Sequence, residues 1–371
     1  MKELVAPVGR PVRRWAIGAR TRAWPPFSRL FVAGDGHDWA IADDVRALRR
    51  VAAGLGVRVG PEGWVAAVRH QSVFHASQFG LFGSGWRRED NRLGVAYLHG
   101  RPGTPGMPEF DVCYDELRTR HAELERVQVS NRAMEELVLG AGIAPEKVHL
   151  IPIGIDLAAF PLRDAISRAA ARRALDLPES AFVAGSFQKD GVGWGEGLEP
   201  KLIKGPDVLL AALERLRECV PELHVLLTGP ARGFVMRGLE RLDIPYRHAL
   251  PAGRDRLAEA YRALDVYLVA SRDEGGPKAV LEAMASGVPL VSTRVGQAAE
   301  LVQDGVNGSL VDAEDADGLA ARAAETAQAP QEQLERMVRA GRETAERTSY
   351  EALLPRWRDL LTGFVAIEDV A

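Results

Sequence analysis

Short apolar runs alternate with longer amphipathic stretches along most of the chain, and each pattern predicts one kind of element. The apolar run Leu30–Ala33 predicts a buried strand, and the amphipathic stretch 43–53 predicts the helix that follows it. Further strands are predicted at residues 73–76, 93–98, 127–130 and 148–152. Strands separated by helices indicate a parallel, doubly wound sheet in an α/β domain.

The same alternation resumes beyond residue 160 and predicts a second parallel sheet. A basic, alanine-rich helix is predicted at 165–175, followed by strands at 181–187, 223–228, 244–248, 266–269, 290–293 and 309–311. A helix at 319–326 and a terminal amphipathic helix at 350–364 complete the pattern. A chain of 371 residues is long enough for two such domains, each with its own core.

Residues 1–28 lack this alternation, because they are basic and interrupted by proline. Their arginines and tryptophans are Arg10, Arg13, Arg14, Arg20 and Arg22 with Trp15 and Trp24. Such a segment could contact an anionic acceptor or a membrane surface. We favour a solvated, partly ordered segment that leads into the first strand.

Composition narrows the class of protein. A net charge of −4 argues against nucleic acid as a partner. The two cysteines, Cys113 and Cys219, lie far apart and suggest a reducing compartment without disulfides. No apolar run approaches the roughly 18 residues of a membrane span, and the N-terminus lacks the apolar core of a secretory signal. We therefore expect a cytoplasmic protein without a transmembrane segment, for which peripheral membrane contact stays open.

Two glutamates, Glu274 and Glu282, frame a glycine-rich turn and the start of an apolar helix. Gly275 and Gly276 allow the backbone to approach a ligand closely, and Pro277 suits the first position of a helix. The N-terminus of that helix would offer amide groups and partial positive charge to an anion. The simple alternative is a buried helix with a solvated glutamate at each end. We favour a phosphate at the amides and sugar hydroxyls at the carboxylates.

The stretch from Glu274 to Leu290 resembles the donor-site motif of glycosyltransferase family 4, which contains retaining enzymes. The resemblance implies the GT-B fold, with two doubly wound, parallel-sheet Rossmann-like domains facing across a cleft. It also implies that Glu274 contacts the transferred sugar and that Glu282 holds the nucleotide ribose, with Lys278 among the residues around the donor. The family usually has an aromatic residue where Gly276 stands.

Residues 151–156 resemble the interdomain hinge of the family, which normally has Asn where Ile153 stands. The resemblance implies an acceptor-side domain at 1–160 and a nucleotide-sugar domain at 161–345. Residues 346–371 would then form a terminal helix that crosses back to the first domain.

Two loops of the first domain are candidates for ligand contact. Gly36 lies in the loop 34–39 between a predicted strand and helix, at the edge of a parallel sheet where ligands bind. His99 directly follows the predicted strand 93–98 and precedes Gly100. It could be a hydrogen-bonded structural histidine. We favour a functional one, because the family has a histidine in this place that approaches the donor sugar.

The diphosphate would be held by lysine. Lys204 and Gly205 match the family's Lys-Gly pair before a helix. Ser186 stands where the family generally has an arginine that helps bind the diphosphate. Lys189, in a glycine-rich insertion at 188–197, is our candidate to replace it, although lysine cannot form a bidentate fork. The insertion fails the spacing of a dinucleotide fingerprint, and we predict a mobile loop near the phosphates.

No metal site or other cofactor is expected. Asp315 and Asp317 match the acidic pattern of metal-dependent transferases, but their position before a helix favours capping. No histidines are spaced as a metal-binding pair. The implied enzyme is therefore a metal-independent hexosyltransferase that uses a nucleoside diphosphate sugar and front-face attack. The departing diphosphate would accept the acceptor's proton.

The acceptor class stays open among a saccharide, a lipid-linked group and a small molecule. Two alternatives share the fold or the site. One is a nucleotide-sugar epimerase or phosphorylase. The other is a non-catalytic nucleotide-sugar-binding subunit, which the changes at Ser186 and Gly276 keep open.

Overall fold

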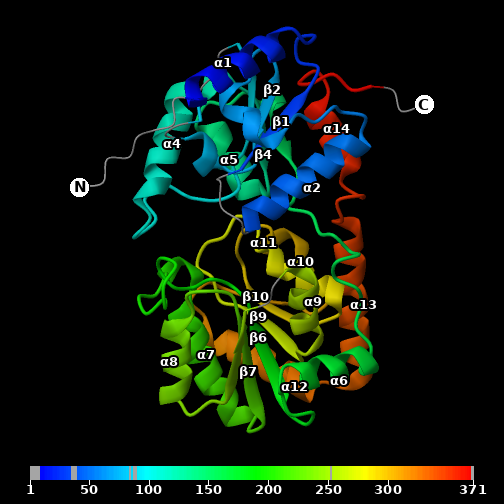
Figure 1. Cartoon of the computed structure of the whole chain (residues 1–371). Helices are drawn as coiled ribbons and strands as arrows, with labels where there is room; N and C mark the ends of the chain where they lie inside the picture. Colours follow the sequence, from blue (N-terminus) through cyan, green and yellow to red (C-terminus); the bar gives the residue numbers. More distant parts are fainter. Residues whose placement is uncertain (1–8, 35–39, 83–84, 87–89, 251–252, 369–371) are drawn as a thin grey trace. The chain divides into compact units, whose positions relative to one another are not determined.

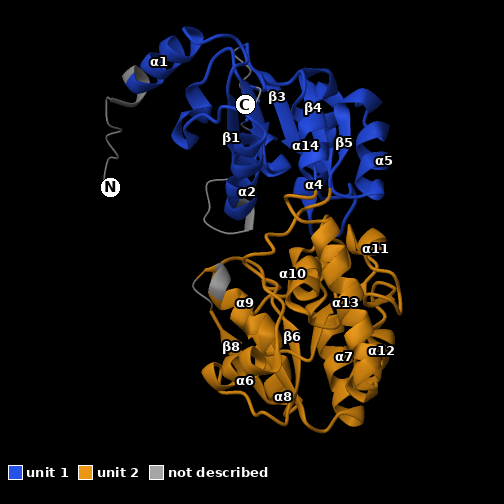
Figure 2. Cartoon of the chain, turned by 90° about the vertical axis from the view of Figure 1, so that its right-hand side faces the viewer, with its two compact units in different colours: residues 1–151, 353–371 blue, residues 152–352 orange. Residues whose placement is uncertain are grey.

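The computed structural model describes residues 9–34, 40–82, 85–86, 90–250 and 253–368. The chain divides into two compact units, coloured separately in Figure 2: residues 1–151 with 353–371 form unit 1, and residues 152–352 form unit 2. The division after Ile151 precedes the predicted boundary at 160. The C-terminal segment belongs to unit 1, which contains α14 (Leu354–Leu361). No described helix is both long and apolar enough to cross a bilayer.

Unit 1 is built on a parallel sheet whose strands follow one another in chain order. They are β1 (Leu30–Ala33), β2 (Ser72–His75), β3 (Arg92–Ala96), β4 (Leu124–Val129) and β5 (Val148–Leu150). Val59 forms a parallel bridge to Leu30, through Leu30 N to Arg58 O and Gly60 N to Leu30 O. β2 pairs with the other edge of β1. β1 therefore has a hydrogen-bonded neighbour on each side, the segment around Val59 on one and β2 on the other.

The helices of unit 1 cover a core that centres on the sheet (Figure 1). Besides α14, they are α1 (Gly9–Arg22), α2 (Ala40–Gly54), α3 (Gln78–Leu81), α4 (Pro108–Arg120) and α5 (Arg132–Gly140), with short 3-10 turns at Glu62–Ala67, His121–Glu123 and Pro145–Lys147. This core contains apolar side chains of β3 and β4 together with side chains of α4 and α5.

Helix α1 gives regular structure to residues 9–22 of the segment that was predicted to be solvated and partly ordered. Ile17, Gly18 and Thr21 are buried on one side of the helix, and the Thr21 Oγ1 accepts a 3.0 Å hydrogen bond from the Arg69 amide. The opposite side stays exposed, with Trp15 at 75%. The proline at position 11 did not prevent helix formation, because the first turn of a helix needs no amide donor there.

Unit 2 contains a parallel sheet in the order β11-β10-β9-β6-β7-β8. The strands are β6 (Phe182–Ser186), β7 (Leu223–Thr228), β8 (Tyr246–Ala249), β9 (Val266–Val269), β10 (Leu290–Thr293) and β11 (Ser309–Val311). The strand order reverses between β6 and β9, which are paired. In open α/β sheets, ligands bind at the carboxyl ends of the strands beside such a reversal.

Helices pack on both faces of the unit 2 sheet (Figure 1). They are α6 (Ala165–Ala174), α7 (Pro206–Cys219), α8 (Gly233–Arg241), α9 (Arg254–Arg262), α10 (Lys278–Ser286), α11 (Ala298–Leu301), α12 (Ala316–Gln328) and α13 (Gln331–Arg347), with a 3-10 turn at Leu202–Lys204. One core contains Leu226 of β7 and side chains of α9, α10 and α13. The other contains Val225 and Leu227 with α7, α8 and α12. Successive strand residues therefore supply opposite cores.

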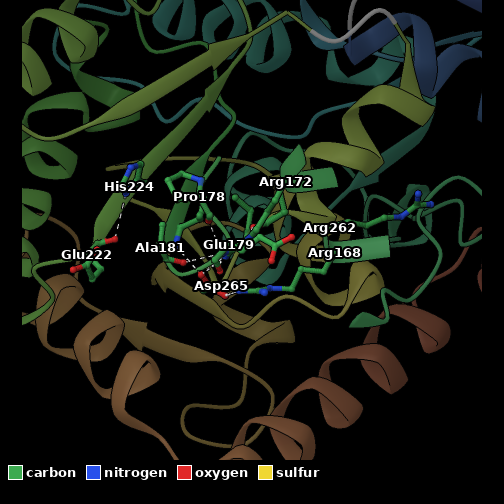
Figure 3. A network of polar contacts seen from close by, with 12 residues as sticks. Arg168, Arg172, Pro178, Glu179, Ala181, Glu222, His224, Arg262 and Asp265 are labelled. Carbon is green, nitrogen blue, oxygen red and sulfur yellow. Dashed lines mark hydrogen bonds and ion pairs between the residues drawn. The ribbon is translucent and has the colours of Figure 1, made fainter. Parts of the chain in front are cut away.

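A buried ionic network anchors the amino-terminal ends of β6 and β9. Arg168 and Arg172 both point to Asp265 (Figure 3), at 2.6 and 2.5 Å. Asp265 also accepts the Val183 amide at 2.7 Å, and the fully buried Arg172 donates to the carbonyls of Glu179 and Ala181. These charges lie at the opposite strand ends from the ligand-binding edge, which assigns them a structural role.

Candidate functional site

The loops after β6 and β9 meet at the strand reversal of unit 2. The 3-10 turn Leu202–Lys204 ends at Gly205, whose φ of 62° is left-handed. A Cβ atom on Gly205 would overlap the carbonyl of Ala270, just beyond β9. Only glycine satisfies both the conformation and the close approach. This contact places Lys204 beside the loop that carries Glu274.

Lys204 and Glu274 form an ion pair. The Lys204 Nζ lies 2.5 Å from the Glu274 Oε1, and the two side chains are 24% and 12% exposed. The Ser271 hydroxyl lies 3.0 Å from the same carboxylate oxygen. The structure thus brings together the residues that the sequence assigned to the diphosphate and to the sugar.

Gln188 joins the start of the insertion to this pair. Its side-chain amide donates to the Lys204 carbonyl at 2.8 Å, and its Oε1 lies 3.2 Å from the Ser271 hydroxyl. The sequence offered no reason to choose Gln188, because its role depends on three loops that meet only in the fold. Ser271, three residues before Glu274, could have been found by its position at the end of the predicted strand.

Helix α10 begins directly after the glycine turn. Pro277 is its N-cap residue, with φ −63°, and Lys278 is its first residue. The first amides of a helix lack acceptors within the helix, which is the basis for expecting an anion there. Gly275, Gly276 and Pro277 lead into this helix end, and the anion itself stays a prediction. The helix ends at Gly287, whose φ is 73°.

Glu282 faces a buried tyrosine from the second turn of α10. The Tyr261 hydroxyl donates a 2.8 Å hydrogen bond to the Glu282 Oε2. Burial, and next the charge of Glu282, raise the pKa of Tyr261. Tyr261 packs against Phe187 and Tyr267, and the Tyr267 hydroxyl accepts from the Phe187 amide at 2.9 Å. An aromatic cluster beneath the strand reversal therefore fixes the orientation of Glu282.

A buried arginine lies beside Ser186, where the family's arginine is missing. Arg232 donates to the Ser186 carbonyl at 2.6 Å, and its Nη2 lies 3.3 Å from the Ser186 hydroxyl. It also donates to the Thr228 carbonyl and pairs with Asp190 at 3.0 Å. Both charged side chains are fully buried. Burial raises the pKa of Asp190, and the charge of Arg232 opposes that shift. Arg232 thus links β6, β7 and the insertion.

Backbone hydrogen bonds attach both ends of the insertion to neighbouring segments of unit 2, and its predicted mobility stays a prediction. Lys201 N donates to Asp190 O at 2.7 Å, Gly233 N to Glu196 O at 2.8 Å and Phe234 N to Gly197 O at 2.9 Å. Its candidate lysine, Lys189, places its ammonium 4.6 Å from the centre of the Trp194 ring. Desolvation lowers the pKa of Lys189.

His99 belongs to unit 1, whereas Lys204 and Glu274 belong to unit 2. It follows β3, and its ring packs edge-on against two aromatic rings, with centres 5.3 Å from Phe79 and 5.8 Å from Phe110. The Gln78 side chain donates to the His99 carbonyl and accepts from the Leu98 amide at 3.2 Å. These contacts fix the backbone at the strand end. Gly36, the other candidate of unit 1, lies outside the described residues.

His75, at the carboxyl end of β2, was not singled out from the sequence. It is 4% exposed, and within the described ranges neither ring nitrogen has a hydrogen-bond partner. Burial lowers its pKa to about 4. The ring is therefore neutral near pH 7.

Asp315 caps α12, as predicted, and Asp317 lies in the first turn of that helix. The Asp315 side chain accepts the Gly318 amide at 2.8 Å. Across the part of the chain that the structure describes, no three His, Cys, Asp or Glu side chains gather as metal ligands would.

The sequence is similar to that of known glycosyltransferases. A family described as "Glycosyl transferases group 1" matches residues 196–328. The D-inositol 3-phosphate glycosyltransferase of Segniliparus rotundus is 31% identical over 328 residues, which cover 82% of this chain and 69% of the relative. The protein of the same name from Xylanimonas cellulosilytica is 38% identical over 196 residues, 49% of this chain and 43% of the relative.

Two solved structures share the fold over most of the chain. The structure of Anabaena HepE in complex with UDP-glucose superposes with a TM-score of 0.71 and 18% identity, covering 90% of this chain and 99% of HepE. Sucrose-phosphate synthase from Thermosynechococcus elongatus gives 0.69 and 18%, covering 90% and 98%.

Proposed function

Because the chain belongs to glycosyltransferase family 4 and has the GT-B fold, we propose that it transfers a sugar from a nucleoside diphosphate sugar to an acceptor hydroxyl, with retention of configuration and without a metal ion. The observation that carries the proposal is the Lys204–Glu274 pair at the strand reversal of unit 2. It combines a cation for phosphate and an acceptor for sugar hydroxyls in one place.

Each part of the donor has a matching group in unit 2. Lys204 and the amides at the start of α10 hold the diphosphate. Glu274 accepts hydrogen bonds from the sugar, and Glu282, fixed by Tyr261, accepts from the ribose. Gly275 and Gly276 admit the donor close to the backbone. Lys278 adds positive charge at the same helix end, and Lys189 adds it from the insertion.

The reaction uses the diphosphate as its own base. The bond between the anomeric carbon and the diphosphate oxygen breaks, and the acceptor oxygen bonds to the same face of that carbon. The acceptor's proton passes to the departing diphosphate oxygen. Lys204 and the helix amides stabilise the charge that develops there, as preorganised donors do in a desolvated site. The family resemblance assigns His99, in unit 1, to the transferred sugar, and this role stays a prediction.

The relatives suggest the first substrates to test. HepE was solved with UDP-glucose, and the Segniliparus relative is named for D-inositol 3-phosphate. We therefore propose a uridine diphosphate sugar as the first donor class and a small hydroxyl compound as the first acceptor class, alongside saccharides and lipid-linked groups.

The experiment is a thermal-shift screen of nucleotide sugars, followed by transfer assays with the best donor in EDTA. Proton NMR of the product's anomeric signal reports its configuration. We expect stabilisation by at least one nucleotide sugar and a product with the donor's anomeric configuration. A product of opposite configuration would contradict retention, and a strict requirement for a divalent ion would contradict the metal-free reaction.

A further inference from the structure

The backbone at Gly276 leaves no space for a side chain. A Cβ atom there would lie 2.7 Å from the Ile153 Cδ1 and 2.9 Å from the Gln297 carboxamide. The family usually has an aromatic residue at this position and Asn at the position of Ile153. The two departures from the family pattern therefore meet in space, and the Ile153 side chain lies where the start of an aromatic side chain would be.

Gln297 joins these two segments from a third. It is 1% exposed, and its side-chain oxygen accepts the Ile153 amide at 2.8 Å. Its side-chain nitrogen lies 3.4 Å from the Ile153 carbonyl, and its own amide donates to the Gly275 carbonyl at 3.1 Å. One buried residue thus holds the segment that begins unit 2 and the β9–α10 loop that carries Glu274.

The turn at Gly296, just before Gln297, is in close contact with the backbone of the β9–α10 loop. Gly296 has a φ of 48°, and a Cβ atom on it would overlap the carbonyls of Glu274 and Gly275. Buried amide groups left without partners are costly, so the Gln297 side chain is held on the Ile153 backbone. From there its carboxamide packs against Gly276, while the Gln297 main-chain amide holds Gly275. The position of the Glu274 backbone follows from this packing.

We infer that Gln297 is a positioning residue for sugar transfer: together with Ile153 it replaces the family's aromatic residue and fixes the loop that presents Glu274. The inference rests on the proposed function. It predicts that Gln297 affects the reacting sugar through the loop, while Lys204 and the helix amides still hold the nucleotide.

The first test compares Gln297→Leu with Asn307→Leu. Asn307 is a matched control, because its amide is also buried and bonded to the Leu301 carbonyl and Thr344, away from the β9–α10 loop. We expect Gln297→Leu to lower kcat about tenfold or more while the Kd for the nucleoside diphosphate changes less than about twofold. We expect Asn307→Leu to lower Tm with kcat nearly unchanged. Equal effects of the two variants on kcat would overturn the inference.

A second test stays informative even if Gln297→Leu fails to fold. Gly276→Ala places a methyl group against the Ile153 Cδ1, and Ile153→Val deletes that carbon. We expect Gly276→Ala to lower kcat and the added Ile153→Val to restore part of it, which is a non-additive pair. Strictly additive effects would overturn the claim that the two positions form one packing unit.

Assays of the wild-type protein distinguish a failure of the proposed function from a failure of the inference about Gln297. If no nucleotide sugar of the screen binds or reacts, the proposed function fails and this inference fails with it. If the wild type transfers sugar and Gln297→Leu, with a native Tm, does so at the same rate, the inference alone is wrong.

Discussion

At the scale of single residues, the site depends on a lysine and a glutamate that are each other's partners. A charge-assisted hydrogen bond contributes about 1.5–3 kcal/mol, and both side chains are mostly shielded from water. Removing one residue therefore changes the environment of the other. Single substitutions at Lys204 and Glu274 report on the pair as well as on each residue's contact with the donor.

We predict a strong coupling between Glu274→Ala and Lys204→Ala. Glu274→Ala should lower kcat more than it weakens nucleotide binding, because Glu274 contacts the sugar. The double variant should lose less than the sum of the single losses in free energy, since each change removes the same ion pair. Steady-state kinetics of all four proteins measure this, and full additivity would show that the pair does not act as a unit.

A second residue-scale prediction concerns Lys189. Its ammonium lies over Trp194, in an insertion whose ends are bonded to the rest of unit 2. If it compensates for the arginine that is missing at Ser186, Lys189→Ala should weaken nucleoside diphosphate binding severalfold in calorimetry. The matched control is Lys147→Ala in unit 1, for which no change is expected. Wild-type affinity in Lys189→Ala would leave Lys204 as the main phosphate-binding lysine.

At the scale of elements, hydrophobic periodicity identified the strands well. Leu223–Thr228, Val266–Val269 and Leu290–Thr293 were predicted to the residue, because fully buried parallel strands are continuous apolar runs bounded by polar turns. The predicted strand 93–98 extends two residues past the end of β3 at Ala96. Tyr97 and Leu98 continue the apolar run of the sequence, but they lie beyond the strand. Helix α1 was missed because proline and many arginines obscure its one buried side.

The candidate site followed from the sequence only where its residues form one local motif. The turn and helix from Glu274 to Glu282 carry their own signal, and Lys204 has its glycine. No such local signal marks four other residues, Gln188, Tyr261, Arg232 and Gln297. Their partners are distant in the chain, so their roles exist only once the strands have been ordered around the reversal at β6 and β9.

The end of β2 supplies a prediction about pH. His75 has a pKa of about 4 in the folded protein, against an ordinary value of 6.5. Between these values the unfolded chain binds more protons than the folded one, so the free energy of unfolding falls as pH drops from 6.5 to 4. The contribution amounts to about 3 kcal/mol. In urea denaturation, the free energy of unfolding of His75→Gln should fall less than that of the wild type between pH 6.5 and 4.

The control for this measurement is His70→Gln, because the His70 side chain is 39% exposed. This substitution also removes one imidazole, but from a side chain that keeps contact with water, so it controls for the loss of a histidine as such. A His75→Gln protein whose stability changes with pH as steeply as the wild type would show that His75 does not remain neutral in the fold.

At the scale of the whole molecule, one group of charged side chains in unit 2 stabilises the fold and lies apart from the candidate site. The Arg172–Asp265 network joins α6 to the amino-terminal ends of β6 and β9 (Figure 3), far along the strands from Lys204. Asp265→Asn would leave the fully buried Arg172 without its counterion. Breaking a buried pair in this way costs about 3–5 kcal/mol.

We therefore predict that Asp265→Asn destabilises unit 2 first. Hydrogen–deuterium exchange should show lost protection in peptides of residues 152–352, with peptides of residues 1–151 less affected. Asp243→Asn is the matched control, because Asp243 is 97% exposed and its pairing with Arg217 is a surface contact that contributes little. Equal protection in Asp265→Asn and Asp243→Asn would contradict the structural role of the network.

The central claim is that Lys204, at the strand reversal of unit 2, holds the donor's diphosphate. The direct measurement is calorimetric binding of a nucleoside diphosphate, and of its nucleoside, to the wild type and to Lys204→Ala. A lost charge-assisted hydrogen bond of about 1.5–3 kcal/mol corresponds to roughly 10- to 100-fold weaker binding. The account predicts that loss for the diphosphate and an unchanged affinity for the nucleoside. Equal affinities of the two proteins for the diphosphate, or an equal loss for the nucleoside, would contradict it.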